Sequence, residues 1–318
     1  MSATSQLHDA LKKIAFKQIL MATDFSEASE RALGYAIAIA RRYGATLSVV
    51  HAIPPEPRDA IPLEPLPREL NRPRLEAEEQ MKHLGETAKM KDLNHHLLLG
   101  QGRAWDVLSS VVQLQEFDLL VLGTHGRGGL KKLALGSVAE EILRRTSCPV
   151  LTVGPHVAPA NSGTIEFKHI LFATDFEPAS ARAFPFALSM AEECRAKLVL
   201  VHMVPPMPCA DLGPFPYAPA ACAAEEFIRW QRTLESESEK RLRDLIPRDS
   251  QLAAEPKYVI GMDFLPEGIL DVAAANQSDL IVMGADLAPS PRLAAHIPWA
   301  LTHEVICRAK CPVLTVSE

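Results

Sequence analysis

The chain contains the same stretch of sequence twice, and this repeat constrains its fold more than any other feature. The segment FKQILMATDFSEASERALGYAIAIARRYGATLSVVHAIPP begins at Phe16, and FKHILFATDFEPASARAFPFALSMAEECRAKLVLVHMVPP begins at Phe167. The two segments align without a gap. The likeness returns in DLLVLG from Asp118 against DLIVMG from Asp279, and in CPVLTV, which closes both halves. The repeat predicts two copies of one domain.

A stretch rich in Gly, Pro, Asn and Ser, GPHVAPANSGTIE, separates the two copies and is typical of a linker. We therefore predict a first domain over residues 1–154, a linker over residues 155–166 and a second domain over residues 167–318. Each predicted domain is long enough to bury a hydrophobic core of its own.

Within each copy, short apolar strands alternate with amphipathic helices. QILMAT is typical of a buried strand, and the segment after it has Leu33, Ile37 and Ala40 at helical spacing, with Ser26 as N-cap and Gly44 as C-terminal stop. Further strands are expected at TLSVVHAI, NHHLLLG, DLLVLG and PVLTVG, and further helices over residues 74–91, 103–116 and 137–147. This order predicts an α/β fold: two tandem doubly wound domains, each with a five-stranded parallel sheet covered by helices on both faces.

Composition argues against nucleic acid and membrane partners. The net charge of −6 and the pI near 6.0 give no general attraction to DNA or RNA. The sequence has no apolar run of about 18 residues, which a membrane-spanning helix needs. The N-terminal MSATSQLHDALKKIAF also lacks the apolar segment of a signal peptide, so we expect a cytoplasmic protein.

The six cysteines include no CxxC pair, which predicts free and largely buried thiols in a reducing compartment. His303, Cys307 and Cys311 have the spacing of metal ligands one helical turn apart. Pro312 indicates, however, that a helix has already ended near Cys311. Packing of these thiols in a core is therefore preferred over a metal site.

Two strands are followed by unusual residues, ATD after the first and GTHG after the fourth. Ligands of an open doubly wound sheet bind at the carboxyl ends of the strands where the strand order reverses. If these strands are neighbours, Asp24 and Gly123 flank one crevice. The loop from Gly126 then leads to a helix that starts near Gly136 and Ser137, whose amides and hydroxyl form an anion site.

The sequence contains no GxxxxGK[ST] motif, and no GxGxxG follows the first strand. The first absence excludes a P-loop of the common NTPase kind, and the second weakens a dinucleotide-binding interpretation.

The motifs together resemble those of the universal stress protein family, over nearly the whole chain. The nucleotide-binding branch of that family has the pattern G-x2-G-x9-G-[ST] after the fourth strand, which is met here by Gly123, Gly126, Gly136 and Ser137, with ATDFS upstream. The resemblance implies the adenine nucleotide alpha hydrolase-like fold. Because single-domain members of the family pair through their last strands, it also implies an intramolecular pseudo-dimer in which the two CPVLTV segments pair and bury two sheet edges.

The same resemblance implies that ATP is the ligand, with Mg²⁺ on its phosphates. The loop Ala22, Thr23 and Asp24 lines the nucleotide in this interpretation, and Asp24 meets either the ribose or the Mg²⁺. The main chain at Ala52 hydrogen-bonds the adenine edge. The other implied contacts are Leu122 and Gly123 on the sugar and base side, Gly126, Gly136, Ser137 and Val138 on the phosphates, and His125 and Arg127 in the same loop.

Several of these residues also have a structural interpretation. Asp24 can simply cap the turn that follows it, and Asp175 stands in the second ATDF although the rest of the site is missing there. His51 and His202 follow apolar strands in the same way in both copies and are interpreted as structural rather than catalytic.

The second copy departs from the glycine pattern. It keeps Gly284, but Leu287 replaces the glycine three residues later, and Trp299 and Ala300 stand where the first copy has Gly136 and Ser137. An indole and a methyl group in these places fill the phosphate space and remove a hydroxyl donor. We therefore predict that the first domain binds nucleotide and that the second is degenerate.

These features predict a nucleotide-dependent regulator or sensor of the stress response, in which a partner protein of unknown identity reads ATP occupancy. One alternative is a weak ATPase or a phosphoryl- or adenylyl-transferring enzyme. Another is a structural or interaction protein without a nucleotide, whose glycines serve turn geometry alone. A homodimer of pseudo-dimers is compatible with the sequence.

Overall fold

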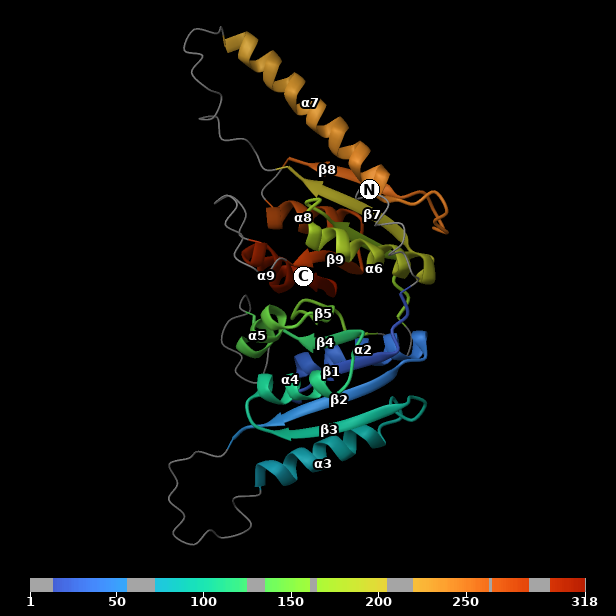
Figure 1. Cartoon of the computed structure of the whole chain (residues 1–318), viewed down its shortest axis with the longest axis vertical. Coiled ribbons are helices and arrows are strands. Elements are labelled where there is room, and N and C mark those ends of the chain that lie inside the picture. Colours follow the sequence, from blue (N-terminus) through green and yellow to red (C-terminus); the bar gives the residue numbers. More distant parts are fainter. Residues whose placement is uncertain are drawn as a thin grey trace. The chain divides into compact units, whose positions relative to one another are not determined.

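The computed structural model describes residues 14–55, 72–124, 135–160, 165–204, 220–262, 265–285 and 298–317. The chain forms two compact units (Figure 1). One unit comprises residues 15–166 and 286–318, and the other comprises residues 1–14 and 167–285. The last helix and strand of the second repeat therefore lie with the first repeat. The boundaries at residues 154 and 167 stay a prediction for the sequence repeats.

The first-repeat unit contains a sheet with the strand order β3-β2-β1-β4-β5-β10. Its strands are β1 (Gln18–Ala22), β2 (Thr46–Ile53), β3 (His95–Gln101), β4 (Leu119–Gly123), β5 (Val150–Val153) and β10 (Val313–Ser317). Strand β1 pairs in parallel with β2 on one side and with β4 on the other, so the strand order reverses at β1. Strand β10 pairs antiparallel with β5, which confirms the predicted pairing of the two CPVLTV segments.

Five described helices belong to this unit: α2 (Glu27–Tyr43), α3 (Arg72–Glu86), α4 (Ala104–Leu114), α5 (Ser137–Arg145) and α9 (Pro298–Arg308). The Ser26 side chain caps α2, and Gly44 ends it with a φ of 63°, as the sequence predicted. Because parallel crossovers are right-handed, the strand order places α2 and α3 on one face of the sheet and α4 and α5 on the other.

The second unit repeats this pattern with the strand order β9-β6-β7-β8. Its elements are β6 (His169–Ala173), α6 (Pro178–Cys194), β7 (Lys197–Met203), α7 (Ala220–Leu245), β8 (Lys257–Gly261), α8 (Leu265–Ala275) and β9 (Leu280–Ala285). All its described strand pairs are parallel. The long helix α7, coloured orange in Figure 1, contacts β7 and β8. The predicted α/β class with tandem parallel-sheet domains is thereby confirmed.

In each repeat, an aspartate side chain accepts hydrogen bonds from the backbone at the start of the first strand. The Asp118 carboxylate accepts hydrogen bonds from the amides of Lys17 at 2.7 Å and Gln18 at 2.8 Å. Asp279 accepts corresponding bonds from Lys168 and from His169, the first residue of β6. The aspartate that opens both DLLVLG and DLIVMG is therefore explained by the fold.

The stretch predicted as a linker packs against the first repeat at its start. The Val157 side chain is buried, and the Tyr35 hydroxyl on α2 donates a hydrogen bond to the Ala158 carbonyl at 3.1 Å. Among the described helices, none combines the length and the apolar character that crossing a membrane requires.

The four cysteines whose side chains the structure describes are in no disulfide, and all are at least partly buried, as predicted: Cys307 and Cys311 are buried, and Cys148 and Cys194 are partly buried. Cys209 and the side chain of Cys222 lie outside the described residues. Helix α9 ends at Arg308, before Cys311, as Pro312 indicated. Within the described ranges, no group of three His, Cys, Asp or Glu side chains has a metal-binding arrangement.

Cys148 should resist alkylation in the folded protein. Burial, and secondarily the Asp118 carboxylate, raise the pKa of its thiol from 9.0 to about 12. Since only the thiolate reacts, a rise of this size lowers the reactive fraction near neutral pH about a thousandfold. Iodoacetamide labelling followed by peptide mass spectrometry should find Cys148 modified far more slowly than Cys194, and at ordinary rates after unfolding. Equal native rates for the two cysteines would contradict this expectation.

Candidate functional site

The loop that follows β1 is shaped by its own hydrogen bonds. The Thr23 amide donates to the Val50 carbonyl at 2.9 Å, which continues the pairing of β1 with β2. The Thr23 hydroxyl accepts from the Phe25 amide at 3.0 Å, and Asp24 Oδ1 accepts from the Ser26 amide at 3.0 Å. Asp24 therefore forms an Asx turn that leads into α2.

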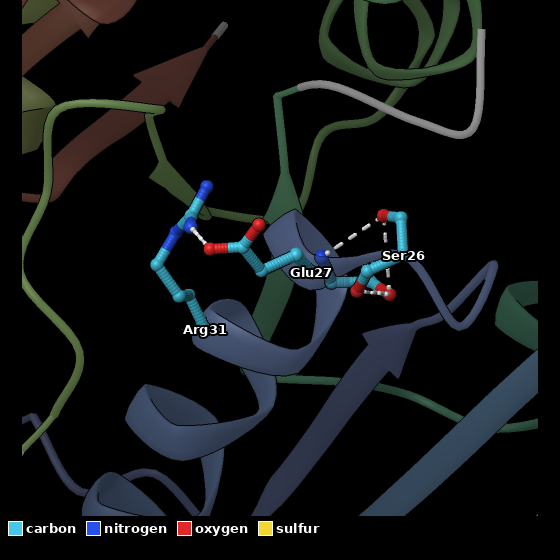
Figure 2. A network of polar contacts seen from close by, with 4 residues as sticks. Ser26, Glu27 and Arg31 are labelled. Atoms are coloured by element: carbon cyan, nitrogen blue, oxygen red, sulfur yellow. Dashed lines mark hydrogen bonds and ion pairs between the residues drawn. The ribbon is translucent and has the colours of Figure 1, made fainter. Parts of the chain in front are cut away.

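The first turn of α2 completes this loop (Figure 2). The Ser29 amide donates to the Ser26 hydroxyl at 3.3 Å, and the Ser29 hydroxyl donates to the Ser26 carbonyl at 2.9 Å. One turn further, Arg31 pairs with Glu27 at 2.7 Å. The capping bonds give hydrogen-bond partners to polar groups that have none within the first turn of a helix. The backbone around Asp24 therefore has a defined shape.

Phe25 has a φ of 59°, in the left-handed region that a bulky side chain rarely adopts. Its ring lies 4.5 Å from the His51 ring, and His51 Nδ1 makes a 2.8 Å hydrogen bond with the Thr23 carbonyl oxygen. His51 thus supports the loop by contacts on both sides of Asp24. These contacts agree with the structural interpretation of His51.

The second repeat contains the same loop. Phe176 has a φ of 64°, and the His202 Nδ1 atom lies 2.8 Å from the Thr174 carbonyl oxygen. Asp175 Oδ1 accepts from the Glu177 amide at 3.0 Å. Burial lowers the pKa of His202, which favours the neutral form of its ring. Because both repeats build the turn in this way, the fold alone accounts for an aspartate at position 24.

The glycine that ends β4 is required by close packing. A Cβ atom on Gly123 would lie 2.8 Å from the backbone carbonyl of Ala28 in α2. A Cβ atom on Gly284, at the same place in the second repeat, would lie 2.3 Å from the backbone nitrogen of Ser180 in α6. Helix and strand approach each other too closely here for any side chain, so Gly123 also has a structural reason.

The chain returns to the end of β4 after the glycine-rich loop. The Thr124 amide donates to the Val153 carbonyl at 3.2 Å, and the Gly136 amide donates to the Thr124 carbonyl at 2.7 Å. The second bond brings the start of α5 to the carboxyl end of β4, as the sequence predicted. The sequence analysis did not identify Thr124 as a residue that holds the start of α5, because a backbone carbonyl leaves no side-chain pattern in the sequence. His125, Gly126 and Arg127 lie outside the described residues.

The start of α5 is unlike the turn after β1 and the glycine at the end of β4, which both repeats share. Gly136 is its N-cap with a φ of −61°, which any residue can adopt, and it makes no side-chain cap hydrogen bond. Ser137 and Val138 are exposed, and Ala139 is buried. Their amides belong to the first turn, where a helix attracts anions. The backbone conformation at Gly136 therefore gives no reason for glycine.

The other predicted site residues lie at the ends of the central strands. Ala22 is the last residue of β1 and pairs in register with Leu122 of β4. Ala52 is near the end of β2 and pairs with Gly100 of β3. Parallel strands end at the same edge of a sheet, so these residues share that edge with Asp24 and the start of α5.

The second repeat is built differently at the corresponding places. Helix α9 begins at Pro298, ahead of Ala300, the counterpart of Ser137, so its first turn starts with a residue that has no N–H. Met203, the counterpart of Ala52, is buried, and its terminal methyl lies 2.4 Å from the place of a Cβ atom on Gly261. The side chain of Trp299 lies outside the described residues, and so does Leu287.

Comparison with known proteins gives a consistent assignment. The model of the Universal stress protein family matches residues 15–154 and again residues 166–317. A universal stress protein of Thermus aquaticus is 37% identical over 139 residues, which cover 43% of this chain and 98% of that protein. Each repeat thus has about the length of a single-domain relative.

Two solved structures of universal stress proteins match the chain, one over nearly its whole length and one over less than half of it. A universal stress protein from Archaeoglobus fulgidus, 17% identical, covers 94% of this chain and 98% of its own, with a TM-score of 0.63. At this identity the likeness shows the fold. A universal stress protein solved in complex with cAMP covers 44% of this chain and 98% of its own, with a TM-score of 0.35 and 25% identity.

The structural interpretation of the shared glycines can be tested by stability. Gly123→Ala and Gly284→Ala should each lower the free energy of unfolding by about 2 to 4 kcal/mol, because the new methyl group meets helix backbone. Gly136→Ala should cost less than about 1 kcal/mol, because its φ is ordinary. Urea denaturation followed by circular dichroism measures all three. An equal loss for Gly136→Ala would show that packing requires this glycine as well.

Proposed function

The chain belongs to the universal stress protein family, and from this premise we propose that it is a nucleotide-dependent regulator that binds ATP in its first repeat. The observation that carries the proposal is the pair Gly136 and Ser137 at the start of α5. Gly136 has an ordinary φ and no side chain over the first turn of α5, and Ser137 is exposed beside it. This pair has no counterpart in the second repeat.

The start of α5 is proposed to bind the phosphates of the nucleotide. The Gly136 amide is engaged with the Thr124 carbonyl, so its contribution is the absence of a side chain. The amides of Ser137, Val138 and Ala139 and the Ser137 hydroxyl supply the donors. Gly126, His125 and Arg127 are proposed to approach the phosphates from the preceding loop.

The adenosine moiety is assigned to the ends of the central strands. The main chain at Ala52 is proposed to bond the adenine edge, and Leu122 with Gly123 to contact the sugar and base. Asp24 is proposed to meet the ribose or a Mg²⁺ on the phosphates. A carboxylate is the ligand type that Mg²⁺ prefers, and this ion usually takes only one or two from the protein. Asp24 therefore fits such an ion in kind, while its Asx turn holds it in position.

The second repeat is proposed not to bind ATP. Pro298 removes one amide donor from the first turn of α9, and the Met203 side chain occupies space beside the end of β7. Trp299 replaces Gly136 in the sequence. One chain should therefore bind one nucleotide, and the signal is the occupancy of the first repeat, read by a partner protein in the cytoplasm.

Substitution of the Gly136–Ser137 pair should abolish ATP binding without unfolding the protein. In the double variant Gly136→Val and Ser137→Ala, an isopropyl group enters the phosphate position and a hydroxyl donor is lost. Isothermal titration calorimetry with ATP and Mg²⁺ should show one site per chain for the unaltered protein and at least about a hundredfold weaker binding for the variant.

The matched control for this experiment is Ser109→Ala, which removes a serine hydroxyl from α4 in the same unit. The Ser109 hydroxyl donates to the Asp106 carbonyl within the helix, so its loss should leave ATP affinity unchanged. Titrations with AMP and cAMP define which nucleotide is preferred. Full affinity in the folded double variant would remove the start of α5 from the site.

Turnover should be slow if occupancy is the signal. With Mg²⁺ and saturating ATP, we expect phosphate release well below about 1 s⁻¹, the lower end of ordinary enzyme turnover. A coupled phosphate assay on the unaltered protein and on the double variant measures this rate. A rate in the ordinary enzyme range that disappears in the variant would instead favour the ATPase alternative.

A further inference from the structure

An arginine from the preceding helix lies beside α5, one turn beyond the proposed phosphate donors. Arg103 is the N-cap residue of α4, at the end of the connection from β3. Its Nη2 atom lies 3.8 Å from Oε1 of Glu141 on α5. Both residues belong to the unit that contains the first repeat, and α4 and α5 contact each other there. Arg103 therefore brings a positive charge from the connection after β3 to the surface of α5.

The carboxylates of α5 already have partners on their own helix. Glu141 pairs with Arg145 at 3.5 Å, and Glu140 pairs with Arg144 at 3.0 Å. In the described part of the chain, Glu141 is the one carboxylate that pairs with Arg103. Three guanidinium groups thus share two carboxylates at this surface. Arg103 is the surplus cation, because it has no carboxylate of its own.

The arginine before α4 has no counterpart in the second repeat. Arg103 directly precedes α4, whereas the residue directly before α8 in the sequence is Phe264. The ion pair within the last helix is kept, since Glu304 and Arg308 on α9 lie 2.7 Å apart. The side chain of Arg103 is 70% exposed, and exposed ion pairs add little to folding stability. The fold therefore gives no strong reason for Arg103, which occurs only in the repeat that is proposed to bind ATP.

The first turn of α5 is within reach of the Arg103 side chain. Glu141 follows Ser137 by four residues, so the two residues lie on the same face of α5, one turn apart. One turn of helix rises by about 5.4 Å. A guanidinium group beside Glu141 can therefore reach the level of Ser137 through a change of side-chain rotamers. Guanidinium groups also suit phosphate oxygens, which they bind by two parallel N–H hydrogen bonds.

We propose that Arg103 binds the terminal phosphates of the nucleotide and thereby selects ATP over AMP. This inference rests on the proposed function, because it extends the phosphate site at the start of α5. In the free protein, Arg103 shares Glu141 with Arg145. In the complex, Arg103 turns to the phosphates, and Arg145 keeps the charge of Glu141 neutralised. AMP has no phosphate beyond the first, so it gains nothing from Arg103.

The test uses three variants of the full chain and three nucleotides. Arg103→Gln removes the charge, and Arg103→Lys keeps it as a compact ammonium group. Arg74→Gln is the matched control: it removes another exposed arginine of the same unit, which pairs with Glu78 on α3 at 2.9 Å, on the other face of the sheet. Calorimetry with ATP, ADP and AMP at one ionic strength gives the affinities, because screening by salt changes such contacts. Circular dichroism verifies that each variant is folded.

For Arg103→Gln, we expect ATP affinity to fall by about tenfold or more, the effect of one charge-assisted hydrogen bond, and AMP affinity to change by less than about twofold. The loss for ADP should lie between these values. Arg103→Lys should restore part of the ATP affinity, because the charge remains while the second parallel hydrogen bond is lost. Arg74→Gln should leave the affinity for all three nucleotides unchanged.

Unchanged ATP affinity in the folded Arg103→Gln variant would overturn the role of Arg103 alone and leave the start of α5 as the site. An equal loss for ATP and AMP would also overturn this role, because the arginine would then act on α5 rather than on the terminal phosphates. Absence of ATP binding in the unaltered protein would overturn the proposed function and, with it, the selection by Arg103.

Discussion

The pairing of β1 with β4 is the constraint on which the rest of the first repeat depends. Because β2 lies on one side of β1 and β4 on the other, successive crossovers run in opposite directions from this point, and the loops after β1 and β4 diverge at one edge. Helix α2 must then start within van der Waals contact of the end of β4, which admits only Gly123 there. The same constraint acts on Gly284 in the second repeat.

Comparison of the two repeats separates residues that the fold needs from residues that it does not. The Asx turns at Asp24 and Asp175, the left-handed Phe25 and Phe176, and the paired histidines occur in both repeats with nearly the same geometry. Each of these has a hydrogen bond or a packing contact that explains it. Gly136 and Ser137 occur in one repeat alone, and the backbone conformation at Gly136 does not require glycine. A motif that mixes both kinds of residue is therefore weaker evidence of function, residue by residue, than its length suggests.

Much of this architecture could be predicted from the sequence because it follows from local chemistry. Apolar runs predicted the central strands, and Ser26 and Gly44 predicted both ends of α2. Helix α3 was expected over residues 74–91, but it spans Arg72–Glu86. After it the chain continues in successive tight turns, one of which is closed by the hydrogen bond from the Met90 amide to the Thr87 carbonyl. In the sequence, such turns keep the residue spacing that is typical of a helix, so this spacing did not predict where α3 ends. The bond from Gly136 to Thr124 joins backbone groups, which carry no side-chain pattern, so it could not be predicted.

The repeats and the compact units do not coincide, and this difference has a physical cause. Strand β5 at the end of the first repeat has an open edge that requires a partner, and the antiparallel strand β10 provides it. The Thr152 hydroxyl donates to the Val313 carbonyl at 3.0 Å, and the Thr315 hydroxyl donates to the Val150 carbonyl at 3.3 Å, so side chains of both strands reinforce the backbone pairing. Once β10 is fixed there, α9 must pack nearby, since only a short connection separates them. In a chain with two copies of the domain, the last helix and strand of the second repeat therefore have to match the surface of the first.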